Sequence, residues 1–316
     1  MTTLLPRAVV LGAFALLLQT GPSAQAQTNQ PAPLHLAASP VDDVMPVLYA
    51  QRTGMFRQAG ISIVLDRANS GGAVSAAVAG GAIDIGKGNI VSIIAAHAHN
   101  VPLVIVAPAA IYDPKTPDAV LLVAASSSLR SARDLAGKTI GTPSLNDLST
   151  VATQAWMEKN GVDWHSVQFV EMPFPSMEAA LEQGRVQAVI QVKPFITDAV
   201  DSGKARILGL NYSAVANRFL ESAWFANSDF VAKNKDLVAK FQRIVAQASA
   251  YTNAHQSETV DLLASWAGID QQRALRVPRI VTGTTLQARE IQPVIDVSAK
   301  YNLIPKVFAA REIMAQ

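Results

Sequence analysis

The sequence predicts an α/β protein made of two similarly built lobes. Short apolar runs alternate with longer helical patterns from Leu34 onward, and the same order of elements returns in the middle of the chain. Strands that alternate with helices indicate sheets with parallel segments. The length of 316 residues and the hydrophobic share of 50% allow two domains, each with its own core.

The first set of elements begins at Leu34. In order, we predict strand Leu34–Ala38, helix Val44–Gln58, strand Ile61–Leu65, helix Ala73–Val78, strand Ile83–Ile85, helix Ile90–His99 and strand Leu103–Ala107. Gly80 and Gly81 end one of these helices, where a glycine permits the left-handed conformation that a side chain would penalise.

The second set follows a turn-rich segment at residues 112–118. We predict strand Lys138–Gly141, helix Asp147–Asn160, strand Val167–Glu171, helix Met177–Gln183 and strand Val186–Ile190. Residues 180–187 repeat the pattern of residues 77–84, which is a helix end, a glycine, a short link and a buried strand. A chance repetition of common α/β patterns is the alternative, but the shared order of elements favours two similar lobes.

The chain then returns to the first lobe. A second connection lies near residues 210–220, and after it we predict strand Ala223–Ala226 and helices Asp229–His255, Ser257–Ala267, Gln271–Leu275 and Leu286–Lys300. The predicted first lobe therefore comprises residues 34–112 and 221–316, and the second comprises residues 113–220. Two crossovers between two lobes are the arrangement that makes a hinge.

The first 26 residues have the pattern of a secretory signal peptide. Arg7 precedes an apolar run from Ala8 to Leu18, and Ala24-Gln25-Ala26 is a small-residue cleavage site. The run is shorter than a membrane span needs, although a permanent anchor is the alternative. We expect cleavage after Ala26, a disordered lead-in at residues 27–33, and a periplasmic protein without a lipid anchor.

Composition excludes several classes of function. The chain has no cysteine, so disulfides, cysteine-ligated zinc, iron–sulfur clusters and thiol nucleophiles are excluded. The net charge is +2 without a cluster of Lys or Arg, which is not typical of a nucleic-acid partner. His97 and His99 stand two positions apart and do not share a helix face, so they do not predict a metal site. No motif pairs a nucleophile with a base, and we expect neither an enzyme nor a cofactor.

Four segments resemble one family of binding proteins. They are residues 48–61 (LYAQRTGMFRQAGI), residues 80–86 (GGAIDIG), residues 134–141 (DLAGKTIG), and residues 180–188 (ALEQGRVQA) followed by Lys193-Pro194-Phe195. In this order they resemble the nitrate/sulfonate/taurine-type solute-binding proteins, also called NMT1/Thi5-like, and the resemblance spans roughly residues 34–252. Gln187 departs from the pattern, which usually has aspartate there, and we interpret this as the loss of a structural carboxylate.

The resemblance implies a type II periplasmic-binding-protein fold with a ligand clamped between the lobes. It also implies a monomer that delivers a small molecule to an ABC permease, which an ATPase energises. Thi5-like binding or synthesis of a pyrimidine precursor is one alternative, but the synthase of that family carries an iron-binding cysteine-rich segment. The effector domain of a LysR-type regulator is another, but the predicted signal peptide stands where its DNA-binding domain would lie.

Candidate ligand-binding residues follow from where strands feed helices. Ligands gather at these junctions, because helix N-termini offer free N–H groups and a partial positive charge. The polar and glycine residues there, with one late tryptophan, are Ser39, Asp42, Ser70, Gly71, Gly72, Lys87, Asn89, Thr142, Ser144, Asn146, Lys193 and Trp224.

Several of these residues have a purely structural alternative. Asp42, Ser70 and Asn89 can stabilise helix starts. Lys87 can be a solvated lysine and Trp224 a core residue. The many donors favour an organic anion, such as a sulfonate, a taurine-like compound or a carboxylate, although two neighbouring aspartates weigh against it.

Overall fold

The computed structural model describes Met1, residues 33–68 and residues 71–315. The chain divides into an N-terminal unit, Met1–Pro31, and one body, Ala32–Gln316, and only the body is considered below. The predicted signal peptide and nearly all of the predicted lead-in lie outside the described residues. Within those residues, no helix has the length and apolar character needed to cross a bilayer.

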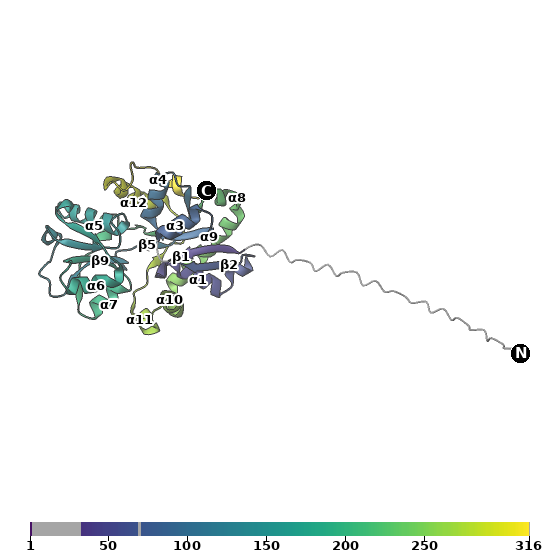
Figure 1. Ribbon diagram of the computed structural model, residues 1–316, viewed down its shortest axis with the longest axis horizontal. Coiled ribbons are helices and arrows are strands. Elements are labelled where there is room, and N and C mark those ends of the chain that lie inside the picture. The colour runs from purple at the N-terminus through teal and green to yellow at the C-terminus, as the bar shows by residue number, and fades with distance from the viewer. Residues whose placement is uncertain (2–32, 69–70, 316) are drawn as a thin grey trace. The chain divides into compact units, whose positions relative to one another are not determined.

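The first sheet has five strands in the order β2-β1-β3-β12-β4. Their bounds are β2 (Ile63–Arg67), β1 (Leu34–Ala38), β3 (Ile85–Asn89), β12 (Ser222–Asn227) and β4 (Leu103–Pro108). Strand β1 is parallel to β2 and β3, whereas β12 runs antiparallel to β3 and β4. We call the part of the body around this sheet lobe 1 (Figure 1).

The second sheet repeats this topology. Its order is β10-β6-β9-β7-β8, formed by β10 (Ala205–Gly209), β6 (Ala119–Ala124), β9 (Ala188–Val192), β7 (Thr139–Thr142) and β8 (Gln168–Glu171). Strand β7 is parallel to β8 and β9, and β6 is antiparallel to β9 and β10. Counted from the parallel edge, each sheet therefore has three parallel strands followed by two alternating ones. We call this part lobe 2.

One side-chain contact also recurs in both lobes. Asp84 Oδ2 accepts a hydrogen bond from the His35 amide at 2.8 Å. Gln187 Oε1 accepts the equivalent bond from the Thr139 amide at 3.0 Å. The glutamine at the position where aspartate is usual therefore keeps the link between neighbouring strands.

The two connections between the lobes lie side by side in a third sheet. It has the order β11-β5-β13, in which β5 (Ala110–Tyr112) pairs antiparallel with β11 (Phe219–Leu220) and β13 (Val281–Thr282). The predicted lobe boundaries coincide with the ends of β5 and β11. Which residues move as a hinge stays a prediction.

Helices cover both faces of the second sheet (Figure 1). Val120 and Leu122 of β6 pack against α6 (Phe174–Glu182) and α7 (Phe195–Asp201), whereas Leu121 and Val123 share a cluster with Met157 of α5 (Leu148–Lys159). Because successive strand side chains point to opposite faces, a strand covered on both sides is a continuous apolar run.

The remaining helices belong to lobe 1 and follow the predictions with two interruptions. They are α1 (Met45–Arg52), α2 (Met55–Gln58), α3 (Gly71–Ala79), α4 (Ile90–Ala98), α8 (Ser228–Lys233), α9 (Lys235–Ala254), α10 (Val260–Ala267), α11 (Gln271–Arg276) and α12 (Ala288–Lys300). The predicted helix Val44–Gln58 is broken at Gly54, whose φ of 77° is left-handed. The predicted helix Asp229–His255 is broken at Asn234, whose backbone leaves the helical region.

Candidate functional site

A cavity of about 260 Å³ lies where the two lobes face each other. Lobe 1 lines it with residues that follow β1, with the end of β3, and with residues near the crossovers. Lobe 2 lines it with the start of α5, with Phe174 and with the residues that end β9. The cavity therefore lies at the strand-to-helix junctions, which is where ligands bind in open α/β sheets.

Lys87 lies on a strand and not in a loop. We predicted that the strand ends at Ile85, but β3 continues through Gly86, Lys87 and Gly88 because β12 pairs with these residues. Phe225 packs against the two glycines; a Cβ on Gly86 would lie 2.9 Å from its Cζ. The lysine side chain is buried, with 6% of its surface exposed, so it is not a solvated lysine.

Lys87 forms a buried ion pair with Asp43. Its Nζ lies 2.7 Å from Asp43 Oδ1 and 2.8 Å from Oδ2. Ser222 Oγ donates a further hydrogen bond to Oδ2 of the same carboxylate. The ammonium group is thus neutralised inside the protein and is not free to pair with an anionic ligand.

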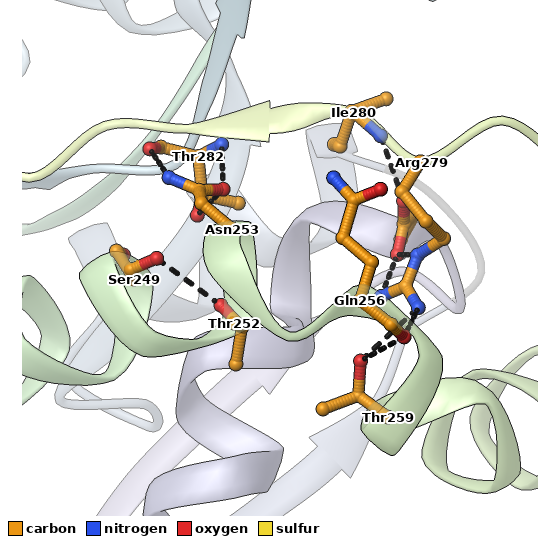
Figure 2. Close-up of polar contacts among 9 residues, drawn as sticks. Ser249, Thr252, Asn253, Gln256, Thr259, Arg279, Ile280 and Thr282 are labelled. Atoms are coloured by element: carbon orange, nitrogen blue, oxygen red, sulfur yellow. Dashed lines mark hydrogen bonds and ion pairs between the residues drawn. The ribbon is translucent and has the colours of Figure 1, made fainter.

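Asp42 is held in the same way by Arg279. The Arg279 Nε donates to Asp42 Oδ1 at 2.7 Å, and the Ile280 amide donates to Oδ2 at 3.0 Å. Figure 2 shows that Arg279 also reaches Gln256 and Thr259, whose carbonyl and hydroxyl oxygens accept from its Nη1 at 3.1 Å. The carboxylate of Asp42 is therefore compensated from lobe 1 itself.

The segment that carries Arg279 is anchored a few residues further on. Asn253 Nδ2 donates to the Thr282 carbonyl at 2.7 Å, and Asn253 Oδ1 accepts from the Thr282 amide at 3.0 Å (Figure 2). These bonds tie β13 to the end of α9.

Asn89 has the capping role that the sequence predicted. Its Oδ1 accepts from the Val91 amide at 2.9 Å and so caps α4, and the residue also lines the cavity. A side chain that caps a helix satisfies donors that an anion would otherwise bind.

The start of α5 forms much of the lobe 2 wall. Asp147 caps this helix by accepting from the Thr150 amide at 3.2 Å. Burial raises the pKa of Asp147 to about 7, and the charge of Glu171 adds to this shift. Ser149, in the first turn, lies 3.1 Å from the hydroxyl of Tyr212, and both residues line the cavity.

The hydroxyl residues that we predicted just before α5 stabilise the loop and do not line the cavity. Thr142 Oγ1 lies 2.8 Å from Thr150 Oγ1, which also donates to the Ser144 carbonyl at 2.6 Å. Asn146 is exposed. The chain makes several turns between β7 and α5, so the cavity-facing polar groups come later, at Asp147 and Ser149.

Lys193 and Asp118 lie at the ends of two paired strands in lobe 2. Lys193 directly follows β9, and Asp118 directly precedes β6. Lys193 Nζ donates to the Thr116 carbonyl at 3.1 Å, and burial lowers the pKa of this lysine. Burial raises the pKa of Asp118 to about 6, against the opposing influence of Lys193. Among the described residues, none forms a hydrogen bond or ion pair with the Asp118 carboxylate.

Glu221 directly follows β11, at one crossover between the lobes, as Asp118 directly precedes β6 at the other. Only 5% of its surface is exposed, and no described residue forms a hydrogen bond with its Oε1. Burial, together with the charge of Asp118, raises its pKa well above the usual value. Sequence reasoning missed Glu221 and Asp118, although each is an isolated acid beside an apolar run.

The structure brings some of the predicted site residues together and separates others. Those that line the cavity are Ser39, Asp42, Lys87, Asn89 and Lys193. Ser70 lies outside the described residues, and Gly71 and Gly72 form the start of α3. Whether any lining residue contacts a ligand stays a prediction.

Trp224, one of the candidate ligand-binding residues, has instead the core position that was its structural alternative. It is fully buried in the lobe 1 core, where its ring meets Phe241 edge-on with centroids 5.8 Å apart. It lies on β12, and successive residues of a strand face opposite sides of the sheet. Trp224 therefore points into the helix-covered core.

Comparison with known proteins agrees with this architecture. The family model described as NMT1/THI5 like matches residues 42–259. The periplasmic aliphatic sulphonate binding protein SsuA of Escherichia coli has a TM-score of 0.77 at 21% identity, covering 90% of this chain and 98% of that chain. The alkanesulfonate-binding protein SsuA of Xanthomonas axonopodis pv. citri, bound to MOPS, has a TM-score of 0.73 at 19% identity with the same coverage.

Two further relatives widen the comparison. The ligand-binding component of an ABC-type import system from Staphylococcus aureus has a TM-score of 0.74 at 13% identity, covering 89% of this chain and 95% of that chain. A Brucella abortus protein named only as a binding protein is 23% identical over 150 residues. The chain spans about half the length of the curated relatives it matches, since the alignment covers 47% of that protein and 47% of this chain. Topology and family match together show that the chain has the type II periplasmic-binding-protein fold and belongs to the NMT1/THI5-like family.

Proposed function

We propose that this protein is the substrate-binding component of an ABC importer, which captures a small molecule by closing its two lobes over it. The observation that carries the proposal is the cavity itself, which both lobes line with polar side chains on an otherwise apolar wall. A concave site that combines apolar surface with polar groups converging from both lobes is typical of ligand binding.

Ion pairs between the lobes support a closing motion. Arg273 of α11 in lobe 1 donates through Nε to Asp198 of α7 in lobe 2 at 3.2 Å, and its Nη2 contacts the same carboxylate. On another part of the boundary, Lys300 of α12 lies 2.9 Å from Glu158 of α5. Partly exposed pairs of this kind each contribute about 0.2–1 kcal/mol, so they can form and break as the lobes move.

A ligand that contacts both lobes would favour the closed form. Such a ligand shifts the equilibrium only by the difference between its affinities for the two forms. The closed form would then dock on a permease in the inner membrane, and release there would not change the ligand chemically. Export through the predicted signal peptide, and the periplasmic and ABC-import relatives, support this assignment.

The charge of the cavity weighs against the organic anion that the sequence led us to expect. Lys87, the best-placed cation, already pairs with Asp43. Two of the helix starts that line the cavity, those of α4 and α5, are capped by Asn89 and Asp147, whereas α6, which begins at Phe174, has no side-chain cap. The ligand-binding proposal therefore stands without a commitment to an anion.

Thermal unfolding with and without small molecules tests the proposal. We expect at least one compound from a set of sulfonates, carboxylates, amines and aminopyrimidines to raise the Tm of purified mature protein, because binding to the folded state stabilises it. Ser39→Trp fills the cavity and should abolish the shift, whereas Ser257→Trp, at an exposed position on lobe 1, should not. An unchanged shift in Ser39→Trp contradicts this site, and chemical turnover of the compound contradicts transport.

A further inference from the structure

The cavity contains more acidic groups than the protein itself neutralises. Its lining includes five carboxyl side chains, Asp42, Asp43, Asp118, Asp147 and Glu221, but only two lysines, Lys87 and Lys193. Arg279, directly behind the wall, is a third cation through its ion pair with Asp42. The question is which carboxyl groups these cations compensate.

Two of the acids are fully accounted for. Asp43 has Lys87 within 2.7 Å, and Asp42 has Arg279 within 2.6 Å. Both pairs are almost completely buried, with side-chain exposures of 10% or less. Neither the acids nor their partners are therefore available to a ligand as free charges.

For the other three acids, the cavity lining offers only one further lysine. Lys193 is the remaining lining cation, and its Nζ forms a hydrogen bond with the Thr116 carbonyl and not with a carboxylate. The Asp118 carboxylate has no hydrogen bond or ion pair with residues 33–68 or 71–315, although its backbone carbonyl accepts from the Lys193 amide. Glu221 Oε1 has none either and is buried. Asp147 accepts one amide bond at the start of α5.

Burying carboxyl groups without partners is costly. An uncompensated buried charge destabilises a protein by several kcal/mol, and carboxyl groups respond by holding their protons. Burial raises the pKa of Asp118 to about 6, and burial together with the charge of Asp118 raises the pKa of Glu221 well above its usual value, which is the expected response. Such an arrangement becomes favourable when a cation enters the cavity.

We propose that the cavity binds a ligand carrying a positively charged nitrogen group, which Asp118 and Glu221 hold between them with Asp147 on the lobe 2 side. This inference rests on the proposed function and gives its substrate class. Asp118 directly precedes β6, and Glu221 directly follows β11, so the two acids stand at the two crossovers. A cation bound there would contact both connections between the lobes and so couple binding to closure.

An anion is the competing ligand class. A single negative charge would add to the excess of carboxyl groups, and like charges at close range repel. A zwitterion is compatible if its ammonium group meets the acids. The experiment must therefore compare ligands that carry a positively charged nitrogen with ligands that carry only an acidic group.

Thermal shift with compounds of defined charge makes this separation. The cationic set is choline, 1,4-diaminobutane and 4-aminopyridine, the anionic set is isethionate, butanesulfonate and butyrate, and taurine is the zwitterion. We expect stabilisation by at least one compound with a charged nitrogen and by none of the anions. Stabilisation by an anion overturns the inference and leaves the binding-protein proposal intact. Stabilisation by none of the compounds overturns both.

Substitutions of the two acids then test whether they contact the bound cation. Glu221→Gln and Asp118→Asn should each weaken binding of the stabilising cation by at least about tenfold, because hydrogen bonds to charged groups contribute that much. Glu178→Gln is the matched control, since this glutamate pairs with Lys204 outside the cavity and its loss should leave the affinity unchanged. Unchanged affinity in both cavity variants would overturn the assignment.

A second measurement needs no ligand. Because the Glu221 carboxyl group is buried and has no hydrogen bond from any described residue, ligand-free Glu221→Gln should have a higher Tm than wild type at pH 8. Glu290→Gln, which removes a buried glutamate paired with Arg218, should have a lower Tm. A lower Tm in Glu221→Gln would show that its carboxylate is compensated by the protein and would overturn the inference.

Discussion

The buried ion pair between Lys87 and Asp43, which lines the cavity, allows a quantitative test of how much it contributes to the free energy of unfolding. Lys87→Met keeps the length and apolar stem of the side chain but removes the ammonium group. Asp43 would keep its bond from Ser222 but lose its cation, at a site where the two side chains are 7% and 6% exposed. Leaving one partner of a buried ion pair uncompensated costs about 3–5 kcal/mol. The double variant Asp43→Leu/Lys87→Met should recover most of this loss, because apolar replacement of a whole buried pair is often nearly neutral.

Urea unfolding followed by tryptophan fluorescence measures the free energies of this double-mutant cycle. The matched control is Arg52→Met, which breaks the Arg52–Asp261 pair on the surface, where the side chains are 37% and 59% exposed. That change should cost no more than about 1 kcal/mol. The reasoning is refuted if Lys87→Met costs as little as Arg52→Met, or if the double variant is no more stable than Lys87→Met alone.

Three further predictions concern the core, the lobe boundary and the helix start at the cavity. Trp224→Ala should lower the free energy of unfolding by about 3–5 kcal/mol without a selective loss of ligand affinity; lost affinity in a stably folded variant would place the ring in the site after all. Arg273→Ala, which removes the pair with Asp198, should speed ligand dissociation by up to about fivefold in stopped-flow experiments, and an unchanged rate would argue against closure through this contact. Asp147 has a raised pKa of about 7, so the folded state retains a proton that the unfolded state has lost, and this contribution to stability disappears as the pH rises from about 4 through 7. Urea unfolding should show that Asp147→Asn lacks this part of the pH dependence, and equal slopes for the variant and the wild type would contradict it.

Much of the fold could be predicted because its signals are local. The order of strands and helices, the left-handed glycines Gly81 and Gly184, and the cap at Asn89 all follow from a few neighbouring residues. The repeat between the lobes was also readable, since the same short pattern stands at residues 77–84 and 180–187. In both copies the structure adds the same strand-bridging side-chain bond.

The prediction of a loop at Gly86-Lys87-Gly88 failed because the decisive partner is distant in the chain: β12 pairs with these residues, and Phe225 packs against the glycines. The hydroxyl residues before α5 are a different case, because Thr142 and the Ser144 carbonyl bond Thr150 only six to eight residues away. That outcome depends on the exact course of the loop between β7 and α5, which residue types alone do not predict.

The sequence by itself determined an α/β protein of two similar lobes with its cavity at strand-to-helix junctions, because helix and strand periods and glycine caps depend on neighbouring residues. Only the tertiary structure decided the charge of that cavity. It pairs Asp42 with Arg279 and Asp43 with Lys87, and it leaves the carboxyl groups of Asp118 and Glu221 without an ion-pair partner among the described residues. The physical reason is that compensation of a charge depends on distance in space: Asp42 and Arg279 are 237 residues apart in the chain, and Asp118 and Glu221 come from two separate crossovers.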